Sequence, residues 1–150
     1  MADPAIDPGA ADPVPGAEGA VLLDTHALLW LQYEPDRLST AQRDVLVQAR
    51  LRLVSAASLY EIAQKVRRGG LPLDAAAVDE LRDGLGAIGL RWLPLTADVM
   101  ARAGGVEWAH RDPFDRMILA AAEATGCPLI SSDARFAADD LPFVVPAVIA

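Results

Sequence analysis

The chain of 150 residues has little cysteine, lysine or aromatic side chain: Cys127 is its one cysteine, and aromatic residues make up 5% of it. A lone cysteine cannot form an internal disulfide, so the chain suits a reducing compartment, and we interpret Cys127 as a small core residue. No apolar run approaches the roughly 20 residues of a membrane span, and the N-terminus is acidic where a secretory signal would be basic. These absences predict a cytoplasmic protein that does not associate with membranes.

Positive charge is scarce as well. The net charge of −8 argues against a general nucleic-acid binder, which would normally be basic. Half of that charge comes from Asp3, Asp7, Asp12 and Glu18, so the rest of the chain is only mildly acidic. The acidity therefore weakens a nucleic-acid function without excluding it, because arginines of the body can still face phosphates locally.

The composition changes sharply near residue 20. Residues 1–19 are almost entirely Ala, Pro, Gly, Asp and Glu, a mixture with little to bury, and we expect a disordered leader there, either a misassigned start or a tether. The following residues 20–150 have the length and apolar content for one compact domain.

Strand-like and helix-like segments alternate through that domain. Strands are expected at 20–23, 52–54, 91–95 and 128–130, with a further edge strand at 143–145. Helices are expected at 26–32, from 39 onward, from 55 or 58 to 69–70, at 74–89, 96–108, 112–126 and 133–138. Strands separated by helices imply right-handed crossovers. We therefore predict an α/β fold with a central, mainly parallel sheet of four to five strands and helices on both faces.

Four acidic residues occupy matching places in these strand–helix units. Asp24 and Asp133 follow apolar strands, while Glu61 and Asp115 lie early in amphipathic helices. In open α/β folds, ligands bind at the edge where parallel strands end. Carboxylates that converge there repel one another unless protons or divalent cations neutralise them. The pattern predicts a Mg²⁺ site, with Mn²⁺ as the alternative, and a metal-dependent nuclease.

Each acid also has a purely structural interpretation. The two acids that follow strands can simply cap the next helix. Glu61 can form an exposed ion pair with Lys65 four residues later. Asp115 can complete a capping box with Asp112 or pair with a neighbouring arginine. The joint occurrence of the four acids at corresponding ends of successive units favours the metal site.

Four stretches, in the same order along the chain, resemble the PIN-domain ribonucleases and, among them, the VapC-type toxins of bacterial toxin–antitoxin pairs. They are Val-Leu-Leu-Asp-Thr-His-Ala-Leu-Leu-Trp (21–30), Ser-Ala-Ala-Ser-Leu-Tyr-Glu-Ile-Ala-Gln-Lys (55–65), His-Arg-Asp-Pro-Phe-Asp-Arg-Met-Ile-Leu-Ala (110–120) and Leu-Ile-Ser-Ser-Asp-Ala-Arg-Phe (129–136). The resemblance covers about residues 20–145. Tyr60 stands where many relatives have tryptophan, and Ser131-Ser132 where threonines are common, but neither departure removes an acid.

The resemblance implies a PIN-like three-layer α/β/α sandwich in which Asp24, Glu61, Asp115 and Asp133 form a catalytic quartet that holds the metal. Asp112 is an auxiliary candidate. The implied activity is that of a Mg²⁺-dependent endoribonuclease, which hydrolyses RNA with metal-activated water and leaves a 5′ phosphate and a 3′ hydroxyl. A cognate antitoxin that inserts a segment into the acid-rich groove, and a homodimer, are implied as partners.

Arg111 and Arg116 flank the acid site in sequence and are candidates to bind the scissile phosphate, although pairing with Asp112 or Asp115 is an alternative. His26 and His110 belong to no Cys or His cluster at ligand spacing, so we expect them to form hydrogen bonds in loops rather than to bind metal.

Other functions remain open. The same fold could serve as a non-catalytic module that binds RNA or a partner, or as a housekeeping RNA-processing nuclease without an antitoxin. An aspartate-based phosphotransferase is disfavoured, because the Asp-x-Asp signature of haloacid dehalogenase-like enzymes is missing and Lys65 is poorly placed.

Overall fold

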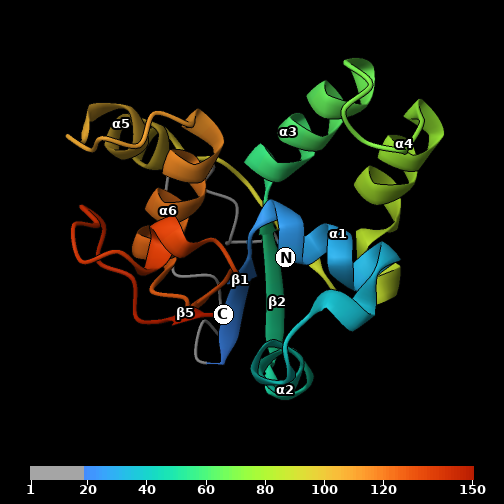
Figure 1. The fold of residues 1–150 in the computed structure, drawn as a ribbon, viewed down its shortest axis with the longest axis horizontal. Helices are drawn as coiled ribbons and strands as arrows, with labels where there is room; N and C mark the ends of the chain where they lie inside the picture. The colour runs from blue at the N-terminus through green and yellow to red at the C-terminus, as the bar shows by residue number, and fades with distance from the viewer. Residues whose placement is uncertain (1–18) are drawn as a thin grey trace, which may run out of the picture.

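A computed structural model describes residues 19–150, which contain one sheet of parallel strands with helices on both faces (Figure 1). The five strands are β1 (Ala20–Leu23), β2 (Leu51–Ser55), β3 (Arg91–Leu93), β4 (Leu129–Ile130) and β5 (Val148–Ile149). Their order across the sheet is β3-β2-β1-β4-β5, and every neighbouring pair is parallel. The predicted parallel α/β fold is confirmed. Apart from Gly19, the predicted disordered leader lies outside the described residues.

The helices connect these strands and begin at the predicted capping residues. The α-helices are α1 (Thr25–Tyr33), α2 (Thr40–Gln48), α3 (Ala56–Arg67), α4 (Ala75–Gly84), α5 (Ala97–Gly105) and α6 (Pro113–Thr125). Three short 3₁₀ segments are η1 (Pro35–Arg37), η2 (Leu85–Ile88) and η3 (Ala134–Ala137). Ser39 and Gln42 form the expected capping box, because each side chain bonds the backbone N–H of the other. Within residues 19–150, no helix has the length and apolar character to cross a bilayer.

The core has two layers because strand side chains alternate between the faces of the sheet. Leu22, Leu53 and Leu129 pack in the core layer under α5 and α6. Leu23 and Val54 point the other way, into the layer that includes residues of α1, α3 and α4. Figure 1 shows α5 and α6 on one side of β1 and β2, with α1 and α4 on the other. This confirms the expected three-layer sandwich.

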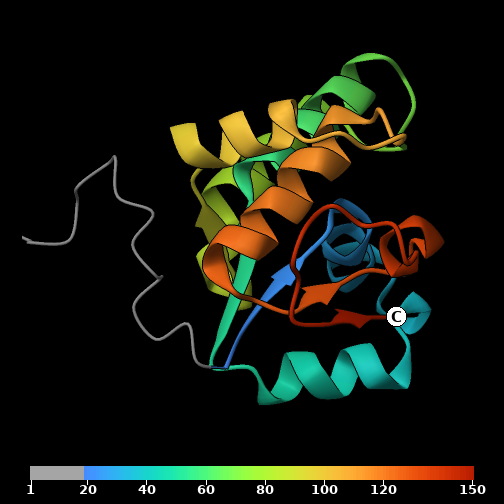
Figure 2. The same ribbon diagram turned by 90° about the vertical axis from the view of Figure 1, so that its left-hand side faces the viewer.

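One strand differs from the prediction. The segment 143–145 is not an edge strand; the edge strand is β5, which pairs in parallel with β4. Phe143 is buried instead and packs edge-on against Trp108. Figure 2 shows the C-terminal end close to the start of α2, where Ser39 Oγ donates a hydrogen bond to Ala150 O at 2.8 Å.

Buried polar side chains gather where the strands end. The described residues whose polar side chains are buried are Asp24, Thr25, Gln42, Ser55, Ser58, Glu61 and Ser131. Asp24, Ser55 and Ser131 come at or directly after the last residues of β1, β2 and β4. Since parallel strands end at the same edge, the fold collects these groups along one rim. Burial of polar groups costs free energy unless they are paired, so this rim is the place to look for a site.

Candidate active site

Asp24 stands at the end of β1 and is only 5% exposed. Its Oδ1 accepts a hydrogen bond from Ala27 N at 2.7 Å, which makes it the N-cap of α1, and its Oδ2 accepts one from Ser131 Oγ. The prediction that Asp24 caps the helix is thus confirmed, and its second carboxylate oxygen also binds Ser131. Burial raises the pKa of the Asp24 carboxyl, and the hydrogen bond from Ser131 only partly opposes that rise. A nearby positive charge would relieve this cost.

Asp133 lies beyond Ser131 on the loop after β4. Its backbone N–H donates to Ser131 Oγ at 3.1 Å, so one hydroxyl connects Asp24 with Asp133. The Asp133 carboxylate caps η3 and receives the guanidinium of Arg135, with Nη2 2.6 Å from Oδ2. That hydrogen-bonded ion pair lowers the pKa of the Asp133 carboxyl. Asp133 is therefore stabilised in its ionised form.

Asp115 projects from the first turn of α6 toward Arg135. Its Oδ2 lies 3.4 Å from Arg135 Nη2 and 2.6 Å from His110 Nε2. Arg135 Nη1 is 3.4 Å from the other ring nitrogen, Nδ1, and an arginine can only donate, so Nδ1 accepts and Nε2 carries the proton that goes to Asp115. Burial raises the pKa of the Asp115 carboxyl, while the His110 hydrogen bond opposes the rise.

Asp112 is the N-cap of α6, with its Oδ1 accepting from Phe114 N at 2.9 Å. The capping box proposed for Asp112 and Asp115 is not formed, because the Asp115 carboxylate turns toward His110 and Arg135 instead. Within residues 19–150, His110, Asp112 and Asp115 can each offer a ligand atom such that all three atoms lie within 4.8 Å of one another. The prediction gave His110 no part in such a group.

Glu61 comes from α3 and is 5% exposed. Its Oε2 pairs with Lys65 Nζ at 2.8 Å, which is the predicted ion pair, but the acid is buried rather than solvated. Glu61 also lines a groove of about 880 Å³ between α3 and α6. We call it the α3–α6 groove and define it by Tyr60, Glu61 and Lys65 on one side and Arg111, Asp112 and Phe114 on the other.

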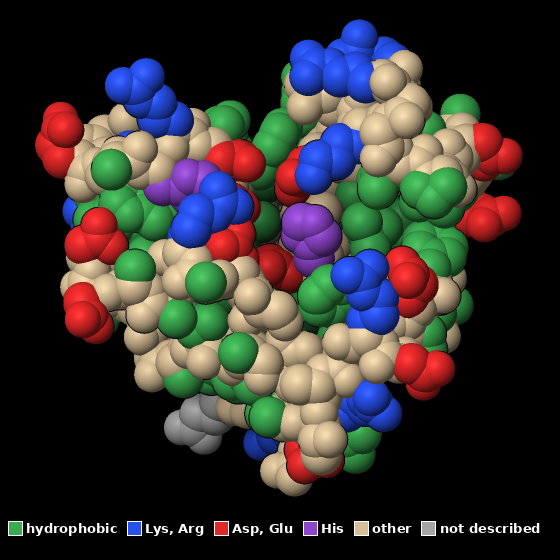
Figure 3. Space-filling model, viewed as in Figure 1, with side chains coloured by type: hydrophobic (Ala, Val, Ile, Leu, Met, Phe, Trp, Pro, Cys, Tyr) green, Lys and Arg blue, Asp and Glu red, His purple; other side chains and the backbone are tan. Residues whose placement is uncertain are grey.

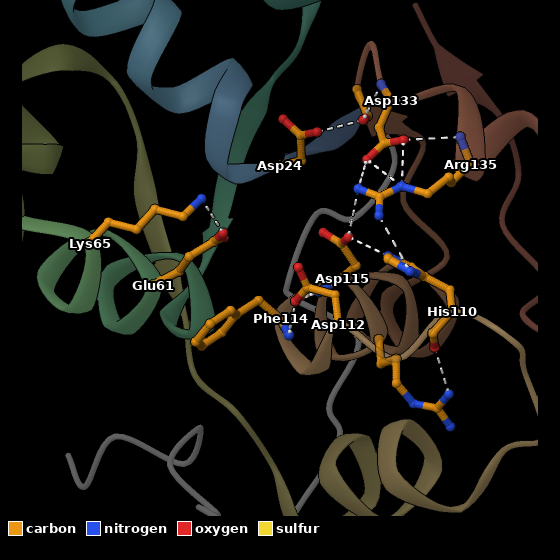
Figure 4. Close-up of polar contacts among 11 residues, drawn as sticks. Asp24, Glu61, Lys65, His110, Asp112, Phe114, Asp115, Asp133 and Arg135 are labelled. Carbon is orange, nitrogen blue, oxygen red and sulfur yellow. Dashed lines mark hydrogen bonds and ion pairs between the residues drawn. The ribbon is translucent and has the colours of Figure 1, made fainter. Parts of the chain in front are cut away.

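The close-up in Figure 4 shows how these acids lie. Asp24, Asp115 and Asp133 come from three separate elements and point into one region, with the Glu61 carboxylate facing it from α3. The contacts run from Asp24 through Ser131 to Asp133, and from Asp133 through Arg135 to Asp115. The fold therefore brings the predicted acids together, with Glu61 joined to them by the groove rather than by a direct bond.

This arrangement fits a divalent cation. The side-chain donors are chiefly carboxylate oxygens, the ligands that Mg²⁺ and Mn²⁺ prefer. Three of the acids already have a positively charged side chain beside them. Arg135 pairs with Asp115 and Asp133, and Lys65 pairs with Glu61. The buried Asp24 has no basic group within ion-pair distance among residues 19–150. A metal ion would supply the positive charge that this carboxylate lacks.

The two arginines predicted to bind substrate have different roles. Arg111 is exposed and lines the α3–α6 groove. Arg116 instead donates to four backbone carbonyls, those of Ala103, Val106, Trp108 and His110. These bonds tie the end of α5 to the loop that carries His110. The structure thus gives Arg116 a structural role, and its interpretation as a phosphate ligand is not retained.

Ser131 and Arg135 had no predicted role in the site, and His110 was expected only to form a hydrogen bond in a loop, which it does with Asp115. Ser131 could have been recognised from its place directly after a buried strand, beside the strand that ends at Asp24. His110 and Arg135 left no such signal, because they reach Asp115 across five and twenty positions of the chain through the fold of two loops. Sequence spacing alone does not reveal such contacts.

Comparison with known proteins agrees with the geometry. Residues 21–140 match the model of the PIN domain family. The chain is 32% identical over 116 residues to Ribonuclease VapC22 of Mycobacterium tuberculosis, an alignment that covers 77% of this chain and 88% of that protein. The fold of the present chain is similar to that of a chain in the crystal structure of VapBC2 from Rickettsia felis bound to a promoter DNA fragment. There the TM-score is 0.58 at 14% identity, over 85% of this chain and 98% of that one.

Proposed function

This chain belongs to the PIN-domain family and is one of its VapC-type nucleases, and on that premise we propose that it is a Mg²⁺-dependent endoribonuclease, the toxin of a VapBC-type module. The observation that carries the proposal is the continuous set of contacts from Asp24 through Ser131, Asp133 and Arg135 to Asp115. The name of the relative from Mycobacterium tuberculosis supports RNA as the substrate.

We assign the metal to the four acids. Asp24 and Asp115 hold the ion, Glu61 completes its coordination or orients water, and Asp133 is the candidate for holding a second ion. A bound divalent ion supplies charge stabilisation for the phosphate and lowers the pKa of water that attacks it. Mn²⁺ has similar ligand preferences and is expected to substitute.

The surrounding residues position these carboxylates. Ser131 donates to Oδ2 of Asp24, so the carboxylate is held with both oxygens fixed. His110 holds Asp115 Oδ2 through Nε2, and Arg116 in turn fixes the backbone of His110. Outer contacts of this kind typically change metal affinity or activity by about 10–100-fold when they are removed. Arg111, exposed beside Asp112, is the candidate to bind the RNA phosphate.

The activity is tested by incubating the purified protein with RNA and Mg²⁺, beside Asp24→Asn and Asp115→Asn proteins prepared in the same way. We expect cleavage by the wild type, loss of cleavage in both variants, and loss on addition of a chelator. Equal cleavage by the wild type and the variants would indicate a contaminating nuclease. No cleavage by any of them would refute the proposal.

A cognate antitoxin, a homodimer and a cytoplasmic location complete the proposed function. The antitoxin is expected to be encoded beside this chain and to offer a cationic side chain to the carboxylates, as Arg135 does within the chain. Co-purification of the product of the adjacent reading frame tests the first point. Sedimentation that returns only a monomer would refute the second.

A further inference from the structure

The loop of residues 131–133, between β4 and η3, helps to hold two of the acids in place. We call it the 131–133 loop. The Ser131 hydroxyl binds both Asp24 Oδ2 and the backbone N–H of Asp133. Figure 3 shows acidic side chains at the bottom of a hollow between the surface formed by α5 and α6 and that formed by α3 and α4. Carboxylates at the bottom of a hollow are open on one side, so their positions depend on contacts with the protein behind them.

Gln42 reaches this loop from α2, although it lies 90 positions before Ser132 in the chain. Its side-chain Nε2 donates to Ser132 Oγ at 3.0 Å and to Ile149 O at 3.1 Å. The same Ile149 carbonyl accepts the backbone N–H of Ser131 at 3.1 Å. Gln42 therefore holds the loop in two ways, directly through Ser132 and indirectly through the β5 carbonyl that Ser131 also binds.

Two backbone groups of opposite kind fix the orientation of the Gln42 amide. Its Oε1 accepts from the N–H of Ser39 at 3.0 Å, and its Nε2 faces the carbonyl of Ile149. Turning the amide over would place donor against donor and acceptor against acceptor. The nitrogen is therefore held on the side of the loop, where it meets Ser132.

The capping box of α2 accounts for only half of this side chain. The box requires an acceptor at the third helical position, and Oε1 of Gln42 provides it. Gln42 is 0% exposed and lies on the buried side of α2 together with Leu46. Burial of an amide costs free energy unless its donors are paired, and the acceptors for Nε2 lie in the 131–133 loop and in β5. The donor half of Gln42 thus serves the loop and not the helix.

We propose that Gln42 is a positioning residue of the metal site. It holds the 131–133 loop so that the Ser131 hydroxyl stays on Asp24. The proposal rests on the proposed ribonuclease function, because it concerns the same acids. Gln42 contacts no acid of the site and acts only through the loop. Loss of its contact with Ser132 should therefore loosen the loop and weaken metal binding by about 10–100-fold, the usual range for contacts that orient metal ligands.

Ser132→Ala tests the proposal with little disturbance, because Ser132 is exposed and the substitution removes the acceptor for Gln42. We expect Mn²⁺ affinity, measured by calorimetry, to fall by about tenfold. In the metal-free protein, the Asp133 amide proton, which bonds Ser131 Oγ, should exchange with solvent faster, as measured by NMR. Ser132→Thr keeps a hydroxyl and should restore both values.

Gln42→Met removes the amide at similar length and should cause both effects. In that protein, Ser132→Ala should cause no further loss, because the contact between the two residues is already gone. The matched control is Ser39→Ala, which removes the hydroxyl of the same capping box but leaves the Gln42 amide and its loop contacts in place. It should lower the melting temperature without changing Mn²⁺ affinity or Asp133 exchange.

Two results would overturn the proposal. One is a Ser132→Ala protein whose Mn²⁺ affinity and Asp133 exchange equal those of the wild type. The other is changes of the same size in the Ser39→Ala and Gln42→Met proteins, which would mean that Gln42 acts only by stabilising α2. Amide exchange is measured without metal, so it decides the role of Gln42 separately from the ribonuclease function, which depends on metal-dependent cleavage by the wild type.

Discussion

Asp24 and Asp133 share one serine hydroxyl, but their surroundings act on them in opposite ways. Asp24 is buried and receives only uncharged donors, and burial raises the pKa of its carboxyl. Asp133 lies near the surface and receives the guanidinium of Arg135, which lowers the pKa of its carboxyl. The inner carboxylate thus needs a cation from outside the chain, whereas the outer one already has one. We infer that metal binding depends more on the Asp24 carboxylate than on that of Asp133.

Asparagine substitution of the two acids should reduce the rate of RNA cleavage to very different extents. Asp24→Asn should reduce RNA cleavage by about 1,000-fold, because a lost metal ligand removes several kcal/mol of transition-state stabilisation. Asp133→Asn should reduce it by only about tenfold, as expected for a more peripheral contact. Single-turnover cleavage rates measure both, with Asp44→Asn on the exposed face of α2 as the control. Similar losses in the two variants would remove the distinction between inner and outer acids.

A smaller effect concerns Arg135, which contacts both Asp133 and Asp115. Its guanidinium competes with a divalent ion for these oxygens. Arg135→Ala should therefore increase Mn²⁺ affinity, by about fivefold if the exposed ion pair contributes about 1 kcal/mol. Arg135→Lys keeps the charge and should change the affinity less. Weaker Mn²⁺ binding by the alanine variant would mean that Arg135 supports the metal site instead of competing for it.

The smallest effect is on stability in the absence of metal. A raised pKa means that folded Asp24 holds its proton more tightly than the unfolded chain, so stability falls as the pH rises from the ordinary value of 3.8 through the raised one. The lowered pKa of Asp133 has the opposite sign, and its stabilisation is present above 3.8 and lost as the pH falls through the lowered value.

At pH 7 with a chelator, Asp24→Asn should therefore raise the melting temperature, by about 2–4 °C if the charge costs about 1 kcal/mol. Asp133→Asn should lower it. Thermal unfolding followed by circular dichroism from pH 4 to pH 8 gives both values. A shift of the same sign in the two variants would contradict the assigned electrostatics.

Much of the fold could be predicted because local signals agreed with one another. The apolar strand before Asp24 and the Asp112-Pro113 start of α6 each marked an element correctly. The edge strand could not be placed from its own residues, because 143–145 and 148–149 are both short and apolar. Pairing with β4 decides between them, and that choice depends on the rest of the sheet.

The acids of the site could be predicted for a related reason. Asp24 and Asp133 follow strands, Asp115 lies in the first turn of α6, and Glu61 lies in the second turn of α3, so the topology carries them toward one edge. Ser131 could have been found in the same way, because it directly follows β4. The other two partners, His110 and Arg135, could not, because they reach Asp115 through contacts between loops. Arg116 illustrates the same limit. Its neighbours in sequence suggested a phosphate ligand, yet its donors bind backbone carbonyls at the end of α5 and in the loop between α5 and α6.

Folding gathers these carboxylates into one cluster, and we expect that cluster to bind a divalent cation. Calorimetric titration of the chelator-treated protein with Mn²⁺ tests it most directly, with the Asp24→Asn and Asp115→Asn proteins measured beside the wild type. We expect saturable uptake by the wild type and uptake weakened by at least about tenfold in each variant. Wild-type protein that takes up no Mn²⁺, or variants that bind it as well as the wild type, would show that these carboxylates do not form a metal site.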